Sequence, residues 1–95
     1  MNIIAAEKMM LKLMREHSVN WPWTFAWNKK RTAFGLCDFE RKRIVLSLPW
    51  VEANSRAVVK NYALHEIAHV LAGARAVDHG RRWKRIALAI GCDGE

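Results

Sequence analysis

Two histidines and a glutamate lie together in an otherwise apolar segment, NYALHEIAHVLAG, at residues 61–73. Burying three polar side chains in one helix requires a compensating interaction. His65 and His69 are four positions apart, so on a helix they share one face, about 6 Å apart along the axis. Both imidazoles could then reach one metal ion at roughly 2.0–2.1 Å. Glu66 would lie beside that ion, where it can take a proton from water, as in the HExxH pattern of zinc peptidases.

A catalytic zinc site has three protein ligands and one open position, so a third ligand must come from elsewhere in the chain. The metzincin pattern would need glycine at position 72 and histidine at position 75, where this chain has Ala72 and Arg75. That class is therefore excluded. The downstream carboxylates are weakly supported alternatives, and one of them is at the last position of the sequence, where fraying is expected. These alternatives are Asp78, Asp93 and Glu95.

His79 is the third ligand that the sequence favours. It follows a loop that lets the chain reverse, and Gly80 leaves room for the backbone beside it. Trp83 comes four positions later, one helical turn away, so its ring could form a wall of the site. Tyr62 precedes His65 by about one turn on the same face. It is a weak candidate for a hydrogen-bond donor to the reacting oxygen, because packing is the commoner role for such a residue.

Three helices are expected to position these residues. Apolar residues at helical spacing predict the first helix from Ile3 to His17. The helix with the two histidines would begin at Asn54 or Ser55, either of which suits an N-cap, and end at Gly73. Because that helix is apolar on more than one side, we expect it to be the buried, central one. The last helix could be capped by Asp78, and its apolar stripe and final glycine are Trp83, Ile86, Ala87, Ile90 and Gly91.

Three strands lie between the first two helices. Alternating or β-branched patterns predict strands at residues 23–28, 32–39 and 43–48, with Gly35 marking a bulge or a close backbone approach and Pro49 stopping the third strand. Short polar turns between them predict an antiparallel meander. Helices packed on one face of such a sheet give an α+β fold, which we expect to form a single domain over residues 1–95.

The composition favours an intracellular globular protein. Hydrophobic residues make up 52% of the chain and charged residues 26%. No apolar run is long enough to span a bilayer, and Glu7, Lys8 and Lys12 interrupt any signal-peptide core. Cys37 and Cys92 have no metal-binding spacing, so we expect reduced thiols, at least one of them buried. We therefore expect a cytoplasmic location and no membrane partner.

The net charge of +7 favours acidic partners, nucleic acid first. Basic clusters occur at residues 29–31, 41–43 and 81–85. If exposed, those of the last helix would place positive charge near the candidate metal site and could contact DNA. They are Arg81, Arg82, Lys84 and Arg85. The 5 tryptophans could stack unpaired bases, although core packing is the commoner role for Trp23 and Trp27.

Two alternative functions follow from these features. One is a DNA-binding module whose metal site is structural or degenerate, and the other is a partner-binding protein that uses exposed tryptophans. A structural zinc site is normally closed by four ligands, usually including cysteine. Three histidines beside a glutamate favour an open, catalytic site instead.

The segment HEIAHVLAG followed by DHGRRW resembles the SprT-like (Spartan-related) metallopeptidase domain. That family pairs HExxH with a later His-Gly and an aromatic residue. Upstream, GLCDFERKRIVLS is similar to the family's Gly-x-Cys strand and the aliphatic strand after it, and downstream RRWKRIALAIG is similar to its closing helix. The resemblance extends from about Trp23 to Gly91.

This resemblance implies a minimal zincin with one N-terminal helix, a three-stranded sheet and two active-site helices. His65, His69 and His79 would hold one Zn²⁺ per chain, and Glu66 would be the general base of an endopeptidase. Family members often cleave DNA-associated proteins. Many members carry a C-terminal zinc ribbon or long tails, whereas this sequence ends at Glu95, so DNA targeting and substrate choice stay open. A compact chain of this kind would suit a phage or mobile element.

Overall fold

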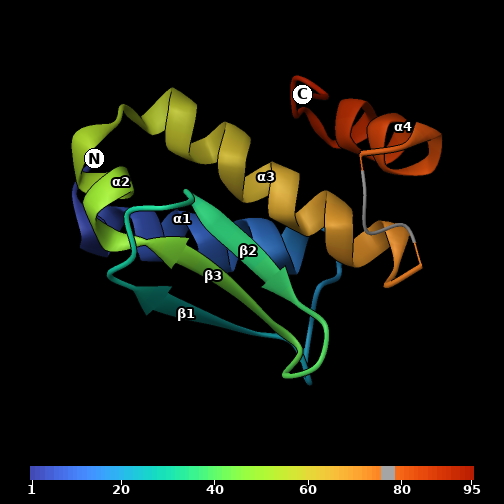
Figure 1. The fold of residues 1–95 in the computed structure, drawn as a ribbon, viewed down its shortest axis with the longest axis horizontal. Helices are drawn as coiled ribbons and strands as arrows, with labels where there is room; N and C mark the ends of the chain where they lie inside the picture. Colours follow the sequence, from blue (N-terminus) through green and yellow to red (C-terminus); the bar gives the residue numbers. More distant parts are fainter. Residues whose placement is uncertain (76–78) are drawn as a thin grey trace.

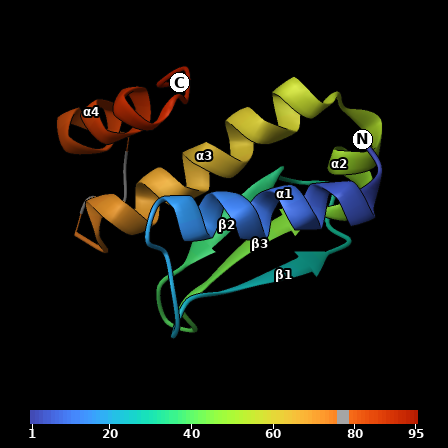
Figure 2. The same ribbon diagram turned by 180° about the vertical axis from the view of Figure 1, so that it is seen from behind.

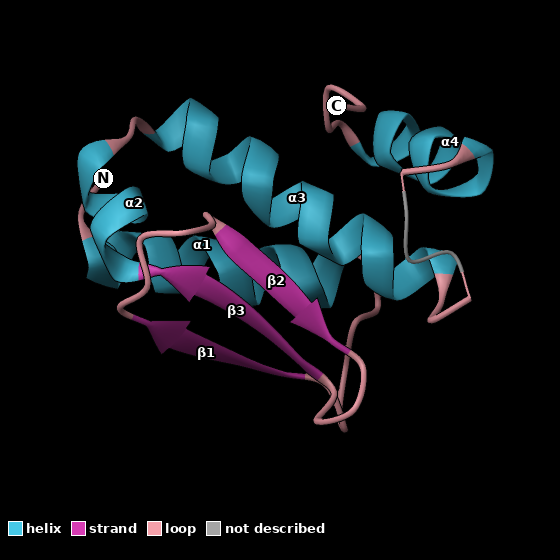
Figure 3. Ribbon diagram, in the orientation of Figure 1, coloured by secondary structure: helices cyan, strands magenta, loops and turns pink. Residues whose placement is uncertain are grey.

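The computed structural model describes residues 1–75 and 79–95. Helices α1 and α3 cover one face of a small sheet, and α4 packs on the side of α3 that faces away from the sheet (Figures 1 and 2). Figure 3 distinguishes the helices from the strands, which follow one another between α1 and α2. The elements are α1 (Ile3–Glu16), β1 (Thr24–Asn28), β2 (Gly35–Asp38), β3 (Arg43–Ser47), α2 (Leu48–Ala53), α3 (Arg56–Ala72) and α4 (Arg81–Ile90).

The three-stranded sheet is mixed, so the predicted antiparallel meander is wrong. Its order is β1-β3-β2, with β3 parallel to β1 and antiparallel to β2. Strand β3 carries the most continuous apolar run and is buried along most of its length, which suits a central position. The connection after β1 passes the end of β3, where the Ser47 hydroxyl donates to the Lys30 carbonyl at 2.6 Å and the Ser47 amide donates to Phe34. These bonds connect the loop between β1 and β2 to the end of β3, which lies between the two strands.

A short helix, α2, follows β3 directly and was not expected from the sequence. Ser47 is its N-cap, and the Ser47 hydroxyl oxygen accepts from the Trp50 amide at 3.3 Å. Pro49 occupies the first turn, where its missing N–H removes no helical bond and its fixed φ favours the helix. The proline that ends the strand therefore also begins a helix.

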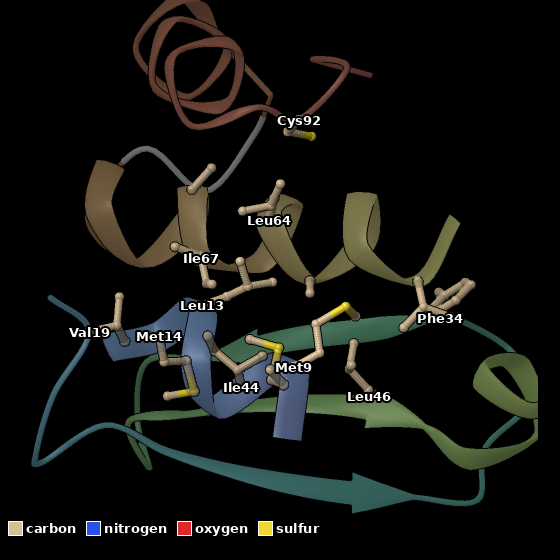
Figure 4. Close-up of a cluster of buried hydrophobic side chains, with 14 of the residues drawn as sticks. Met9, Leu13, Met14, Val19, Phe34, Ile44, Leu46, Leu64, Ile67 and Cys92 are labelled. Atoms are coloured by element: carbon tan, nitrogen blue, oxygen red, sulfur yellow. The ribbon is translucent and has the colours of Figure 1, made fainter. Parts of the chain in front are cut away.

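The core lies between α1, α3 and the inner face of the sheet, as the buried side chains in Figure 4 show. Met10 from α1, Ile44 and Leu46 from β3, and Val59 and Ile67 from α3 are all fully buried. Helix α3 begins after the predicted cap Ser55, whose hydroxyl oxygen accepts from the Val58 amide, and it is the central helix as predicted. Among the described residues, no helix combines the length and the apolar character needed to cross a membrane.

The ends of α4 differ in how well the sequence predicted them. Gly91 ends the helix in a left-handed conformation, as predicted. Gly80 occupies the N-cap position, and the predicted cap, Asp78, lies outside the described residues. Cys37 and Cys92 are both free thiols, and Cys92 is buried, in agreement with the sequence analysis.

Gly35 is required where β2 passes β3. A Cβ atom at this position would lie 2.6 Å from the Val45 carbonyl oxygen and 2.8 Å from Leu46 Cδ2. The Val45 oxygen belongs to the backbone of the central strand, so it cannot move without disturbing that strand. We expect Gly35→Ala to lower the free energy of unfolding by about 1–3 kcal/mol, measured by urea denaturation. Thr32→Ala, at an exposed loop position, is the control and should change it by less than about 0.5 kcal/mol. Equal stability of the two variants would contradict the close approach.

Candidate metal centre

Three histidines converge beside the C-terminal half of α3. His65 and His69 belong to α3, and His79 lies two residues before α4. One candidate ligand atom from each lies within 4.8 Å of those of the other two. The Nε2 atoms of His69 and His79 are 3.2 Å apart. Two nitrogens that bind one tetrahedral zinc ion lie roughly 3.3 Å apart. The His69–His79 separation therefore suits a shared metal ion, and the three imidazoles form a group that could hold one.

Trp83 of α4 supports all three imidazoles from one side. Its ring is fully buried, and its centroid lies 4.7 Å from that of His65, 5.3 Å from that of His69 and 4.5 Å from that of His79. The indole Nε1 donates to the His65 backbone carbonyl at 3.3 Å. Packing of α4 on α3 thus positions the rings, as expected from the spacing of His79 and Trp83.

Burial keeps the histidines of α3 in the form that binds metal. It lowers the pKa of His69 to about 4, and the imidazoles of His65 and His79 add to this effect. The pKa of His65 is also lowered, first by burial and then by His79. Metal binding requires a neutral imidazole, so these shifts leave both nitrogen donors available at neutral pH.

Glu66 is the buried carboxyl of the site. Its side chain points to the same cleft as the histidines, and only 5% of the residue is exposed. Burial raises the pKa of Glu66 to about 7. A carboxyl group that titrates near neutral pH can both accept and donate a proton under the same conditions, which is the requirement for a general acid–base group.

A cleft of about 350 Å³ lies between α3 and strand β2. A Cβ at Gly35 would be 3.6 Å from the Glu66 carboxylate, an ordinary contact distance, so β2 lies directly against α3 at this point. Of the described strands, β2 pairs with β3 alone, which leaves its outer edge unpaired beside the cleft. The lining residues are Gly35, Leu36, Cys37, Phe39, His65, Glu66, His69 and His79.

No site role was predicted from the sequence for Cys37 of β2 or for Phe39, which follows the strand directly. Alternation along the strand indicated that Gly35 and Cys37 share a face, but not that this face meets α3. Burial raises the pKa of Cys37 to about 12, and the nearby Glu66 and Asp38 carboxylates contribute. The thiol therefore stays protonated, and Cys37 lies outside the ligand group formed by the described residues.

Other candidate residues are not brought into the ligand group. Tyr62 stacks on Phe34 with centroids 4.1 Å apart and does not line the cleft, so packing is its observed role. The side chain of Asp93 accepts from the Glu95 amide at 3.1 Å, and neither residue belongs to the ligand group. Asp78 lies outside the described residues.

Comparison with known proteins agrees with this arrangement. The model of the SprT-like family matches residues 6–94. The crystal structure of the metallopeptidase zymogen of Methanocaldococcus jannaschii jannalysin is similar in fold, with a TM-score of 0.77 and 14% sequence identity, over 95% of this chain and 85% of that one. A search of curated proteins finds no significant match. The α+β, zincin-like fold class predicted from the sequence is thus confirmed, with a mixed sheet.

The buried Glu66 should make the stability of the metal-free protein depend on pH. Its pKa rises from 4.5 to about 7 on folding, so the folded state binds more protons between these values and its stability falls as the pH rises. Glutamine does not titrate. With a chelator present, Glu66→Gln should be more stable than the wild type by on the order of 3 kcal/mol at pH 8 and about equal near pH 4. Urea denaturation at both values measures this difference, and a pH-independent difference would contradict it.

Proposed function

The chain belongs to the SprT-like family, and on this premise we propose that it is a zinc-dependent endopeptidase. The convergence of His65, His69 and His79 beside the buried Glu66 is the observation that carries the proposal. The fold shared with jannalysin, described as a metallopeptidase zymogen, supports the same reaction class.

In the proposed reaction the three histidines hold one zinc ion and Glu66 is the general base. Zinc, when bound, supplies Lewis acidity that activates water and polarises the scissile carbonyl. Glu66 accepts the proton of the attacking water and passes it to the leaving amine. Burial raises the pKa of Glu66 in the metal-free chain, which makes its carboxylate a stronger proton acceptor. Trp83 excludes water from one side of the imidazoles and keeps them oriented.

The unpaired edge of β2 is the proposed binding surface for the peptide substrate. An extended peptide could add to this edge through main-chain hydrogen bonds, which recognise backbone rather than particular side chains. Central strand β3 has neighbours on both sides and offers no such edge. A substrate on β2 would lie along the cleft that contains Glu66 and the histidines.

Glu66→Gln should separate catalysis from metal binding. The amide keeps the size of the side chain but cannot accept a proton, so we expect casein cleavage to fall by about 100-fold or more with zinc content unchanged near one per chain. His69→Ala should lose both cleavage and zinc. His17→Ala, at the end of α1 and away from the site, is the control and should keep both. Full activity of Glu66→Gln would exclude it as the base, and absence of zinc uptake by the wild type would exclude the metal site.

DNA is the proposed second partner, supported by the charge on α4. Arg81, Arg82, Lys84 and Arg85 are all exposed, and Arg82 also donates to the Ala72 carbonyl at 2.8 Å. Trp23 and Trp27 pack against the core, which leaves the strongly exposed Trp21 as the tryptophan most available for stacking. The basic clusters beside β1 and β3 lie near opposite ends of the sheet, so α4 offers the densest positive surface close to the metal centre.

Replacing Lys84 and Arg85 with alanine should weaken DNA binding and reduce its salt dependence. Each lost phosphate contact should lower the slope of log K against log salt by about one. Fluorescence anisotropy with a short DNA at several salt concentrations measures this. Lys8→Ala with Lys12→Ala on α1 is the matched control. Binding that survives chelation, with casein left intact by the zinc-loaded protein, would favour the alternative of a DNA-binding module with a degenerate metal site.

A further inference from the structure

A second groove lies on the face of the sheet that α1 and α3 leave free (Figures 1 and 2). Side chains alternate along a strand, so Leu36 and Asp38 of β2 point to this face, whereas Gly35 and Cys37 point to the cleft beside α3. The groove has a volume of about 260 Å³. Its lining residues are Ala26, Trp27, Asn28, Lys30, Leu36, Asp38, Arg41, Arg43 and Val45.

This outer groove is positively charged. Three cationic residues line it within the described part of the chain, namely Lys30, Arg41 and Arg43. They face one carboxylate, Asp38, whose Oδ2 atom lies 3.3 Å from Arg41 Nη1 and 3.7 Å from Arg43 Nε. The side chains of the two arginines are still 63% and 42% exposed, and Lys30 is exposed as well. The groove therefore has an excess of positive charge that a ligand can reach.

The outer groove and the cleft meet at the unpaired edge of β2. Leu36 lines both of them and is 39% exposed. A peptide that adds to this edge as a strand would point alternate side chains to the two faces of the sheet. One set would face Glu66 and the three histidines, and the other set would face the outer groove. The groove would thus contact side chains next to the bond that is cleaved.

A peptide suits the outer groove better than a nucleic acid does. Asp38 lies beside two of the three cations, where a phosphate backbone, which is charged at every nucleotide, would meet its carboxylate. A peptide strand can place an uncharged residue there. The indole Nε1 of Trp27 donates to Glu7 of α1 at 2.9 Å, so this ring is held toward the helices and is not free to stack on a base.

We propose that the outer groove receives acidic side chains of a peptide bound along β2, so that the chain favours substrates with acidic residues at alternate positions around the cleaved bond. This inference rests on the proposed function, because it names the substrate class of that site. Lys30 and Arg41 would determine specificity without touching the reacting atoms. Charge complementarity between the groove and the carboxylates is the physical basis of the preference.

Peptide binding is the direct test, measured on the full chain by fluorescence anisotropy with a chelator present to prevent cleavage. The probes are a labelled peptide with glutamate at every second position and a counterpart with glutamine at those positions. The glutamate peptide should bind about fivefold more tightly at low salt, since exposed ion pairs are individually weak. The difference should disappear at about 1 M salt, where such charges are screened.

Replacing Lys30 and Arg41 with glutamine leaves Arg43 and Asp38 to neutralise each other in the groove. Both replaced side chains are exposed, so we expect the fold to be kept and the two peptides to bind equally. Lys30→Glu with Arg41→Glu should instead favour a peptide with lysine at the same positions. Lys8→Gln with Lys12→Gln removes the same charge from α1, on the other face of the sheet, and should keep the preference for glutamate.

Kinetics separate this inference from the proposed function. In the zinc-loaded protein, the glutamine double variant should raise KM for the glutamate peptide about fivefold, with kcat and the cleavage of the glutamine peptide unchanged. Equal binding of both peptides by the wild type would overturn the inference, while cleavage of either would leave the proposed peptidase intact. Preferential binding without any cleavage would overturn the proposed function instead. If the double variant lost binding to a short single-stranded DNA but kept its preference for glutamate, the groove would belong to nucleic acid and the inference would be wrong.

Discussion

The burial of polar side chains on α3 is the constraint on which the rest of the structure depends. Glu66 is 5% exposed and His69 is 8% exposed, in a helix whose other buried positions are apolar. Burial disfavours the charged form of both groups, so it lowers the pKa of His69 and raises the pKa of Glu66. It makes the histidine a neutral donor and the carboxyl a group that titrates near neutral pH. One physical cause thus prepares the candidate ligands and the candidate base together.

The surrounding elements serve this helix from two sides. On one side, the edge strand β2 and α3 form the cleft that Glu66 lines, beside an unpaired strand edge. On the other, α4 brings Trp83 against all three imidazoles and follows directly after His79. The chain then returns to α3 through a turn that is held by Asn61. The cleft and the support of the imidazole rings therefore occupy different faces of α3.

Much of the fold could be predicted from local patterns. The helix from Ser55 onward, the three strands and the glycine end of α4 agree with the observed elements, because caps and apolar periodicity act over a few residues. Strand pairing could not be predicted in the same way. The meander assumed that neighbours in sequence pair, whereas β3 takes the central place, where its apolar run is best buried. Helix α2 was missed because Pro49 ends a strand and begins a helix equally well.

The spacing of His65 and His69 follows from the sequence alone, since residues four apart on a helix share a face. The sequence also singled out His79 and Trp83, which the structure brings to the same point. Only the tertiary structure decided that β2 lines the cleft, that Tyr62 packs on Phe34 and that Asn61 accepts from the Asp93 amide. These relations join segments far apart in the chain. They depend on how α3 packs against the sheet and α4, which no local pattern encodes.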